Sequence, residues 1–499
     1  MEKPEQFQYQ AKARFRGNKM GFITVEMLVA LSLLVVSLTS LTILGFGSQS
    51  LTVDSYTNDE ALQMAILQLE NARKTAKTNF ESITATSTTN GIYSSQLSVE
   101  NFDCLKHVSS QVTWNRNNRP QTTKLETYIS NPPEAFRFGG DCRIGFPNTW
   151  LNPGTYDSID ISPGGNNGTD LDLQRVNGVR YIFLSSVHST SSSPDLWIFD
   201  FTQLNNPTLV NSIDTGSGVN ALDAAKVGDN YYIFAAQEDE NKQLQIIDVT
   251  NPASPVVVAE KKLEGIGNPD PEGQSITFYN NRVYIGTRAT NGDEFQIYDV
   301  STPSNPTLLG KISVNQDVRD IEIRNELISG GTRTIAYLGL SSTGSDPELR
   351  ILDVTNTSNI TTLTSLNLVG NEPVNAISLS GNKMFFGRDG HNTNPEIYAY
   401  DITNPTSPTL LGTAQTNLGT QNGITNILVL RDLLFVGTND PNQEFQVWGV
   451  ANPSTMVQYS SFNFSQETTG LDYIDDLIVI SAKSNDSLRI IYDQDNPPQ

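Results

Sequence analysis

A single carboxylate, Glu26, lies near the start of an apolar segment that runs from Phe22 to Phe46 and contains no other charged residue and no proline. A carboxylate at mid-membrane depth is destabilising by roughly 2.5–3.5 kcal/mol, so Glu26 is expected to have a role. Four basic residues precede the segment, between positions 12 and 19. Such a basic flank keeps its end of a membrane-spanning helix in the cytoplasm.

The apolar segment is long enough to cross a membrane. A helix over residues 22–46 would be about 37 Å long at about 1.5 Å per residue, and the hydrocarbon core of a bilayer is about 30 Å thick. An amphipathic pattern follows, with Leu62, Ala65, Ile66 and Leu69 at helical spacing. We therefore expect one long N-terminal helix over residues 22–80, of which residues 22–46 are transmembrane.

The stretch Lys19-Met-Gly-Phe-Ile-Thr-Val-Glu26 resembles the processing signal of type IV prepilins. The resemblance implies that residues 1–21 are a leader, that a prepilin peptidase cuts after Gly21, and that Phe22 becomes a methylated N-terminus. It also implies that the helix becomes part of a filament core, where Glu26 pairs with the terminal amino group of a neighbouring subunit. A low dielectric strengthens such a pair. The alternative is a plain signal anchor, which would need neither Glu26 nor Gly21-Phe22.

Charge and cysteine content limit the partners and the compartment. The 499 residues carry a formal charge of −22, and an acidic surface repels phosphates, which argues against nucleic acid as a partner. Only two cysteines are present, Cys104 and Cys142. Outside the cytoplasm they favour a disulfide, which would stabilise the fold by roughly 4 kcal/mol through loop closure. Two unrelated buried thiols are the alternative.

Residues 81–150 favour a small β structure. Polar and apolar residues alternate over 97–100, 108–114 and 123–129, and residues 115–120 are typical of a turn. A long helix followed by a small antiparallel sheet resembles the head of pilins. The expected fold class of the N-terminal part is therefore an α+β pilin module.

From about residue 155 the chain repeats itself. The clearest copies have an apolar strand that ends in Asp, followed by a Pro-containing turn, as in Asp248-Val-Thr-Asn-Pro252 and Asp299-Val-Ser-Thr-Pro303, and in one degenerate copy Gly449 replaces the Asp. Copies recur every 48 to 54 residues, the size of a four-stranded blade. Seven copies predict an all-β, seven-bladed propeller over residues 151–499, similar to propellers built from LVIVD repeats. We expect residues 155–161 to supply the outer strand missing after the last unit, which closes the ring.

Two groups of polar residues in the repeats are candidates for function. The repeated Asp is expected to be structural, because its carboxylate can accept backbone N–H groups and fix the turn. The innermost strands open with polar residues that should surround the mouth of the central channel: Asn220, Gln274, Arg319, Asp320 and Asn375. A ligand could bind at this mouth, or the channel could hold only water.

Little in the sequence points to catalysis. The three histidines, His107, His188 and His391, are scattered, and no metal cluster, nucleophile elbow or phosphate loop is present. We therefore expect no enzyme, no metal site and no other cofactor. Acidic or polar loops at 237–241, 289–294, 389–392 and 439–444 could hold Ca²⁺, although none has the EF-hand spacing. Solvated hairpin tips are the alternative.

The expected function follows from the two halves of the chain. The chain would be a minor or tip-associated type IV pilin-like subunit that displays a propeller for adhesion or recognition. Its partners would be other pilin subunits through the N-terminal helix, the prepilin peptidase, the membrane, and an unidentified surface or host-cell ligand. It would start in the cytoplasmic membrane, single-pass with the N-terminus inside, and end at the cell surface. The alternatives are a pseudopilin of a type II-like secretion system and a membrane-anchored extracytoplasmic scaffold.

Overall fold

A computed structural model describes residues 22–76, 80, 83–102, 105–116, 119–130, 150–161, 166–188, 193–267, 271–328, 331–342, 344–464, 466–474, 476–484 and 486–497. Within these ranges, side chains are described except at 22–30, 41–55, 101, 102, 166, 188 and 327. The chain forms two compact units. One unit holds residues 1–71, 85–97 and 109–126, and the other holds residues 72–84, 98–108 and 127–499.

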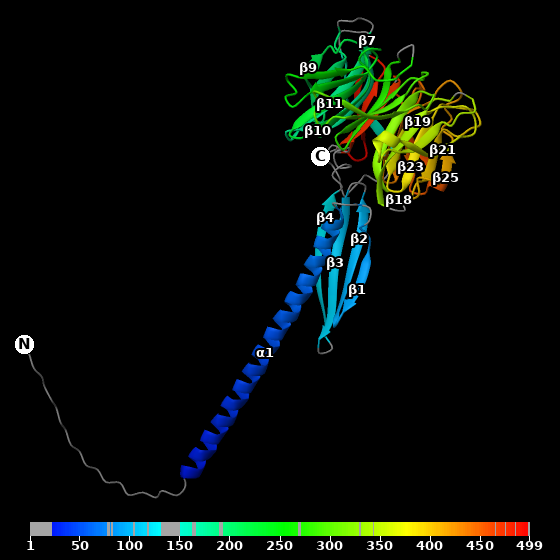
Figure 1. Cartoon of the computed structure of the whole chain (residues 1–499). Helices are drawn as coiled ribbons and strands as arrows, with labels where there is room; N and C mark the ends of the chain where they lie inside the picture. The colour runs from blue at the N-terminus through cyan, green and yellow to red at the C-terminus, as the bar shows by residue number, and fades with distance from the viewer. Residues whose placement is uncertain are drawn as a thin grey trace, which may run out of the picture. The chain divides into compact units, whose positions relative to one another are not determined.

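The only α-helix among the described residues is α1 (Phe22–Ala76), which has 55 residues (Figure 1). The expected end was residue 80. Near its C-terminal end α1 packs on a sheet through Ala61 and Ala65, which are fully buried beside Val112 and Trp114. These alanines allow close packing because they carry no side chain beyond Cβ.

The sheet beside α1 has the strand order β1-β2-β3-β4. Its strands are β1 (Thr86–Asn90), β2 (Tyr93–Phe102), β3 (Leu105–Arg116) and β4 (Arg119–Ser130). The three predicted strand segments fall within β2, β3 and β4. The short edge strand β1 was not predicted, because its sequence Thr-Ser-Thr-Thr-Asn is exposed throughout and has no apolar alternation.

Several predictions for the N-terminal part concern residues that the structure does not describe. Gly21, Cys104 and Cys142, and the side chains of Phe22 and Glu26, lie outside the described residues. Within the described part of the chain, no helix combines the length and apolar character that crossing a membrane requires. Of the expected span over residues 22–46, only residues 31–40 have described side chains.

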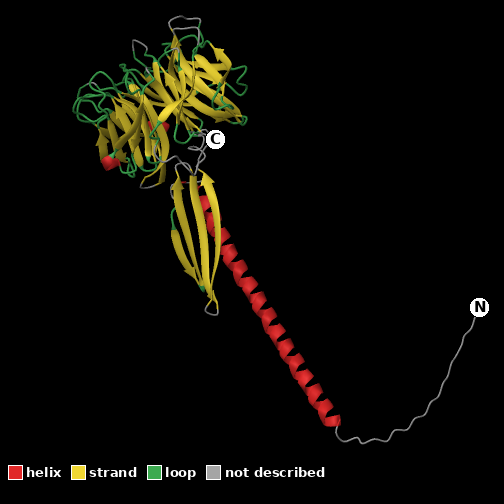
Figure 2. Cartoon of the chain, turned by 180° about the vertical axis from the view of Figure 1, so that it is seen from behind, coloured by secondary structure: helices red, strands yellow, loops and turns green. Residues whose placement is uncertain are grey.

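From Pro153 onward the chain forms seven four-stranded antiparallel sheets, which are the blades of a propeller (Figures 1 and 2). Blade 1 consists of β6 (Asn166–Val176), β7 (Val179–His188), β8 (Leu196–Asp200) and β9 (Thr208–Ile213). Blade 2 consists of β10 (Val219–Val227), β11 (Asn230–Gln237), β12 (Leu244–Asp248) and β13 (Val256–Lys261). Blade 3 consists of β14 (Gly273–Tyr279), β15 (Arg282–Thr287), β16 (Phe295–Asp299) and β17 (Thr307–Ile312).

Blade 4 consists of β18 (Val318–Ile328), β19 (Gly331–Leu340), β20 (Leu349–Asp353) and β21 (Thr361–Leu366). Blade 5 consists of β22 (Val374–Ser380), β23 (Lys383–Arg388), β24 (Ile397–Asp401) and β25 (Thr409–Ala414). Blade 6 consists of β26 (Ile424–Leu430), β27 (Leu433–Thr438), β28 (Phe445–Gly449) and β29 (Val457–Phe462). Blade 7 consists of β30 (Thr468–Ile474), β31 (Leu477–Ala482), β32 (Leu488–Asp493) and β5 (Pro153–Ile159).

The predicted ring closure is confirmed. Strand β5 pairs antiparallel with β32, so that Leu488 lies opposite Ile159 and Asp493 opposite Pro153. Each pair of neighbouring blades encloses an apolar core, and the cores are formed mainly by the second and third strands of each blade. The first strand of each blade is the innermost one.

The expected fold class is wrong for the N-terminal part of the chain. Beyond α1, the described residues form eight four-stranded sheets and two short 3-10 turns, so the protein is nearly all β from Thr86 on. Strands β2, β3 and β4 have 10 to 12 residues, longer than the alternating segments suggested. The N-terminal part is therefore one helix attached to a mainly β chain, and the predicted α+β pilin module is not found among the described residues.

The repeated Asp has the structural role that the sequence predicts. In five blades its Oδ1 accepts the backbone N–H two residues on, as from Thr250 to Asp248 at 2.8 Å and from Thr403 to Asp401 at 2.7 Å. These hydrogen bonds form the turn between the third and fourth strands. A partial positive charge from the N–H group stabilises the ionised carboxylate, and the pKa of Asp401 is accordingly lowered, mainly by its hydrogen bonds to Thr403.

A second acid repeats just before the third strand and was not predicted. Glu294, Glu348, Glu396 and Glu444 are fully buried there, and each accepts a backbone N–H about 20 residues further along the chain. Glu396, for example, accepts hydrogen bonds from the Thr416 N–H at 2.7 Å and from Gln415 Nε2 at 2.6 Å. These acids tie the loop between the second and third strands to the segment after the fourth.

Candidate functional site

The innermost strands of the seven blades pack on one another in sequence and form a closed ring around the propeller axis. Each of them carries a β-bulge near its start, and the bulged residue is polar in every blade. We call these seven residues the mouth ring: Thr169, Asn220, Gln274, Arg319, Asn375, Thr425 and Thr469. Four of the five residues that the sequence proposed for the channel mouth belong to it, and Asp320 is the next residue after Arg319.

Most of the mouth ring is engaged in bonds between blades. Asn220 Nδ2 donates to the Gly273 carbonyl at 2.8 Å, and Asn375 Nδ2 donates to the Ile424 carbonyl at 2.9 Å. Arg319 Nη1 donates to Asn375 Oδ1 at 3.1 Å. In four blades a side chain of the preceding blade donates to the first carbonyl of the innermost strand: Thr169 to Val219, Asn220 to Gly273, Ser275 to Val318 and Asn375 to Ile424. Ligand binding at this mouth therefore stays a prediction.

Below the mouth ring lies a set of acids, of which the sequence analysis singled out only Asp320. We call Asp170, Asp172, Asp223, Asp320, Glu322 and Asp472 the channel carboxylates. Asp170 and Asp320 follow a mouth-ring residue directly, and the other four lie three positions beyond one. That fixed offset from a polar residue at the start of the innermost strand is the signal that could have identified them.

The channel carboxylates bind the innermost strand of the next blade. Asp172 Oδ2 accepts the Ala224 N–H at 2.6 Å, and Asp223 Oδ2 accepts the Phe278 N–H at 2.6 Å. Asp472 Oδ2 accepts the Leu173 N–H at 3.0 Å, which links blade 7 back to blade 1. The innermost strand has an open edge toward the channel, and these bonds satisfy N–H groups that would otherwise lack a partner.

Burial, reinforced by nearby like charges, raises the pKa of two of these acids, Asp170 and Asp172. Desolvation raises the pKa of Asp170 to about 7, against the lowering effect of the Leu222 and Leu171 N–H groups, and the charges of Asp320 and Asp223 add to the rise. Desolvation also raises the pKa of Asp172 well above its usual value, and Asp223 and Asp472 reinforce the shift. Burial therefore favours the protonated form of Asp170 and Asp172 relative to an exposed carboxyl group.

The described residues show no cluster of three or more His, Cys, Asp or Glu side chains that could hold a metal ion. In two of the acidic loops suggested for Ca²⁺, carboxylate oxygens accept hydrogen bonds from the backbone of their own loop. Asp239 Oδ1 accepts the Asn241 N–H at 2.8 Å, and Asp440 Oδ1 accepts the Asn442 N–H at 2.9 Å. His391 Nδ1 accepts the Asn394 N–H at 3.1 Å, which is also a hydrogen bond within one loop.

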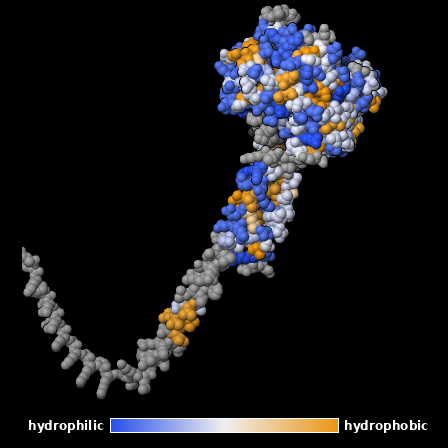
Figure 3. Space-filling model, in the orientation of Figure 1, coloured by the Kyte–Doolittle hydropathy of each residue, from blue (hydrophilic) through white to orange (hydrophobic). Residues whose placement is uncertain are grey.

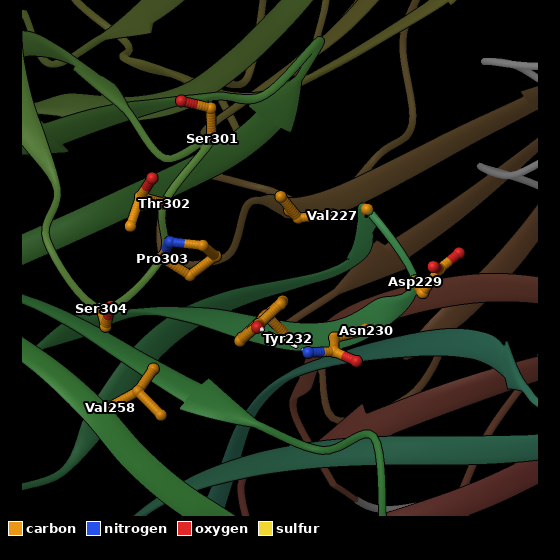
Figure 4. Close-up of a pocket in the computed structure, with 10 residues that line it drawn as sticks. Val227, Asp229, Asn230, Tyr232, Val258, Ser301, Thr302, Pro303 and Ser304 are labelled. Carbon is orange, nitrogen blue, oxygen red and sulfur yellow. Dashed lines mark hydrogen bonds between the residues drawn. The ribbon is translucent and has the colours of Figure 1, made fainter.

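A pocket of about 520 Å³ lies at the far end of β10 from the mouth ring (Figure 4). It is formed by the hairpin of Val227, Gly228, Asp229 and Asn230 in blade 2 and by residues 301–304 in the turn of blade 3. Asp229 is the one charged side chain among the described residues of its lining. None of the residues that the sequence proposed for binding lines this pocket.

Comparison with known proteins supports the repeat assignment. The LVIVD repeat matches residues 226–260, 272–314 and 397–416, so the chain contains LVIVD repeats. These segments lie in blades 2, 3 and 5, and each includes the repeated Asp or the strand that follows it. No curated protein sequence matches the chain.

Several solved structures have low similarity to the chain. A chain of the mitotic checkpoint complex is 12% identical, with a TM-score of 0.48 over 70% of this chain and 96% of that one. BamB from Moraxella catarrhalis is 13% identical, with a TM-score of 0.40 over 66% and 84%. An inactive virginiamycin B lyase from Staphylococcus aureus is 13% identical, with a TM-score of 0.46 over 67% and 98%. These similarities carry no argument about function.

Proposed function

We propose that the chain is a minor or tip-associated subunit of a type IV pilus-like filament, which displays its propeller outside the cell for adhesion or recognition. The observation that carries this proposal is the surface of α1 between residues 31 and 40. Its large apolar side chains, among them Leu31, Leu33 and Val36, are 52% to 64% exposed. Figure 3 shows this part of the helix as an apolar patch.

The apolar side chains surround the helix axis. At about 100° per residue, the exposed residues Leu31, Leu33, Leu34, Val35, Val36 and Leu38 point in all directions. A surface helix of a globular protein has one polar face, whereas this stretch has none. It therefore requires apolar surroundings on every side, which a bilayer before assembly and a bundle of neighbouring subunit helices after assembly would supply.

The few hydroxyl groups in this stretch suit the same surroundings. Ser37 Oγ donates to the Leu34 carbonyl at 2.9 Å, Thr39 Oγ1 donates to the Val35 carbonyl at 2.8 Å, and Ser40 Oγ donates to the Val36 carbonyl at 2.7 Å. These three hydroxyls thus find their acceptors within the helix, as an apolar medium requires.

The prepilin-like motif supplies the second support. Gly21, Phe22 and Glu26 follow one another in the order that peptidase cleavage after Gly21 and pairing of subunits through Glu26 would require. A propeller of seven blades is much larger than the sheet of β1 to β4, and placing one on every subunit would crowd a tightly wound shaft. A sparse or terminal position in the fibre is therefore favoured.

Processing is tested by mass spectrometry of the protein isolated from cells. We expect the mature chain to begin at Phe22 and its α-amino group to carry a methyl group. A mature protein that still begins at Met1 would contradict the proposal. Purified fibres in which this chain is the dominant subunit would contradict the minor or tip position.

Assembly is tested by Glu26→Ala, with Glu70→Ala as a control that removes a carboxylate from the same helix outside the apolar stretch. We expect Glu26→Ala to be processed normally and yet to be lost from sheared surface fibres, whereas Glu70→Ala is incorporated. Normal incorporation of Glu26→Ala would exclude the pairing role. Loss of secretion with intact fibres on deletion of the chain would favour a secretion pseudopilus instead.

A further inference from the structure

The pocket between blades 2 and 3 has an apolar floor and a polar rim (Figure 4). On the floor, Val227 and Tyr232 are each 8% exposed, and Pro303 is buried. The rim consists of exposed polar residues from both blades: Asp229, Asn230, Ser301, Thr302 and Ser304. The volume of about 520 Å³ lies within the range of about 300–1,000 Å³ that is usual for small-ligand sites.

Comparison with the preceding pair of blades shows why the pocket is open. Between blades 1 and 2, Asn177 in the first hairpin turn donates through Nδ2 to the Thr250 carbonyl at 3.3 Å. The register of the strands places Gly228 of blade 2 at the position of Asn177. Gly228 has no side chain that could reach residues 301–304 of blade 3, so the corresponding bond between blades 2 and 3 is missing and the space stays open.

Both sides of the pocket are held in place by the fold. On one side, Val227 lies opposite Asn230 across a two-residue hairpin turn, and Asn230 Nδ2 donates to the Tyr232 hydroxyl at 3.3 Å. On the other side, the Ser301 N–H donates to Asp299 Oδ1 at 2.8 Å, the bond that forms the repeated turn. The rim is therefore largely ordered before a ligand arrives, which lowers the entropic cost of binding.

The side chains of the rim suit a neutral ligand rich in hydroxyl groups. The Asp229 carboxylate accepts hydrogen bonds, whereas the Asn230 amide and the three rim hydroxyls both donate and accept. A sugar offers hydroxyl groups that match this set and C–H groups that can pack on the apolar floor. The negative charge of Asp229 disfavours an anion. A cation would lack an exposed aromatic face, because Tyr232 is largely buried.

We propose that this pocket binds a neutral saccharide. Asp229 and the rest of the rim exchange hydrogen bonds with the sugar hydroxyl groups, and the floor contacts the sugar C–H groups. The inference rests on the recognition role proposed above for the propeller, and it gives that role a class of ligand. It makes no use of the mouth ring, which lies at the other end of β10.

An array of immobilised oligosaccharides tests the proposal with the full-length chain in a detergent that has no sugar headgroup. The array presents neutral glycans that end in glucose, galactose, mannose or N-acetylglucosamine, and sialylated and sulfated glycans for comparison. We expect binding to at least one neutral glycan and competition by the same sugar in solution. Binding to no neutral glycan, or to anionic glycans alone, would overturn the proposal.

The variant Gly228→Asn fills the pocket with the side chain that blade 1 carries. It is compatible with the fold, because Asn177 has a φ of 52° where Gly228 has 62°, and a Cβ at Gly228 would meet no atom within 4 Å. We expect the affinity for the glycan to fall at least about tenfold. Gly381→Asn makes the same change at the corresponding turn of blade 5, also at positive φ and in open space, and should bind like the wild type.

The variant Asp229→Asn tests the carboxylate, because it keeps the size of the side chain and removes the charge. We expect at least about tenfold weaker binding, since a charged acceptor makes stronger hydrogen bonds than a neutral one. Asp432→Asn is the matched control, at the corresponding exposed turn position of blade 6. Wild-type affinity in either Gly228→Asn or Asp229→Asn would refute the site.

The N-terminus of the same protein, isolated from cells, separates this inference from the filament role. A chain that begins at Phe22 and binds no neutral glycan would refute the saccharide site and leave the filament role intact. A chain that begins at Met1 and binds a neutral glycan through Asp229 would refute the filament role and support the site.

Discussion

Glu396 illustrates how one buried acid holds a blade together. It is fully buried and accepts hydrogen bonds from the backbone N–H groups of Thr416 and His391 and from the side-chain amide of Gln415. We expect Glu396→Ala to lower the free energy of unfolding by roughly 2–3 kcal/mol, because it leaves buried N–H groups without an acceptor. Glu396→Gln is the matched control, since Gln243 occupies the equivalent position in blade 2 and accepts the Leu263 N–H. Denaturant unfolding measures both, and an equal loss in the two variants would contradict this account.

Asp299 represents the repeated turn acids, and its contribution depends on pH. Hydrogen bonds to Ser301 hold the pKa of Asp299 below its usual value, so its stabilising effect is present at neutral pH and is lost as the pH falls through the folded value, below about pH 4. We expect Asp299→Ala to lower stability by about 1 kcal/mol at pH 7 and by much less near pH 3. Thermal melting across this range checks the prediction, and a loss independent of pH would count against it. Exposed Asp432→Ala is the control.

At the scale of elements, the segment that leads into β5 is the critical one. Trp150 is fully buried, contacts the Phe435 ring edge-on at 5.0 Å, and accepts a hydrogen bond from Ser460 Oγ through its carbonyl at 2.7 Å. It therefore fixes the start of the closing strand against blade 6. We expect Trp150→Ala to lower the free energy of unfolding by roughly 3–5 kcal/mol and Trp150→Phe by clearly less. Calorimetry of both variants tests this, and a wild-type melting temperature in Trp150→Ala would show that the anchor is dispensable.

At the scale of the molecule, the propeller contains all the strands that it needs between residues 150 and 499. We expect a chain of residues 150–499 to fold into a monomer with a cooperative melting transition. A chain of residues 160–499 lacks β5, exposes the edge of β32 and should associate or aggregate. Size-exclusion chromatography and circular dichroism compare the two chains. Identical monomeric behaviour would mean that the pairing of β5 with β32 is not needed for a closed ring.

Repetition made the propeller predictable from the sequence, whereas the candidate site was only partly predictable. The Asp-containing turns recur at a nearly constant spacing, and each turn is a local structure that four or five residues determine. Asn220 and Asn375 were correctly placed at the start of innermost strands, but their use in bonds between blades was not foreseen. Apart from Asp320, the channel carboxylates were missed, because residues such as Asp172 and Asp472 are about 300 positions apart and interact only in the closed ring.

The sequence by itself determined the number of blades, the turn acids and the closing strand, because each of these depends on local hydrogen bonds or on the repeat length. It also contains the motif around Gly21 and Glu26, which supports the proposed filament role. Only the tertiary structure decided that the chain is nearly all β beyond α1, that Trp150 anchors the closing strand, and that Asp170, Asp172, Asp223 and Asp472 interact with one another. These features arise from contacts between distant strands, and the pKa values of the acids depend on burial and mutual distance, which exist only in the folded ring.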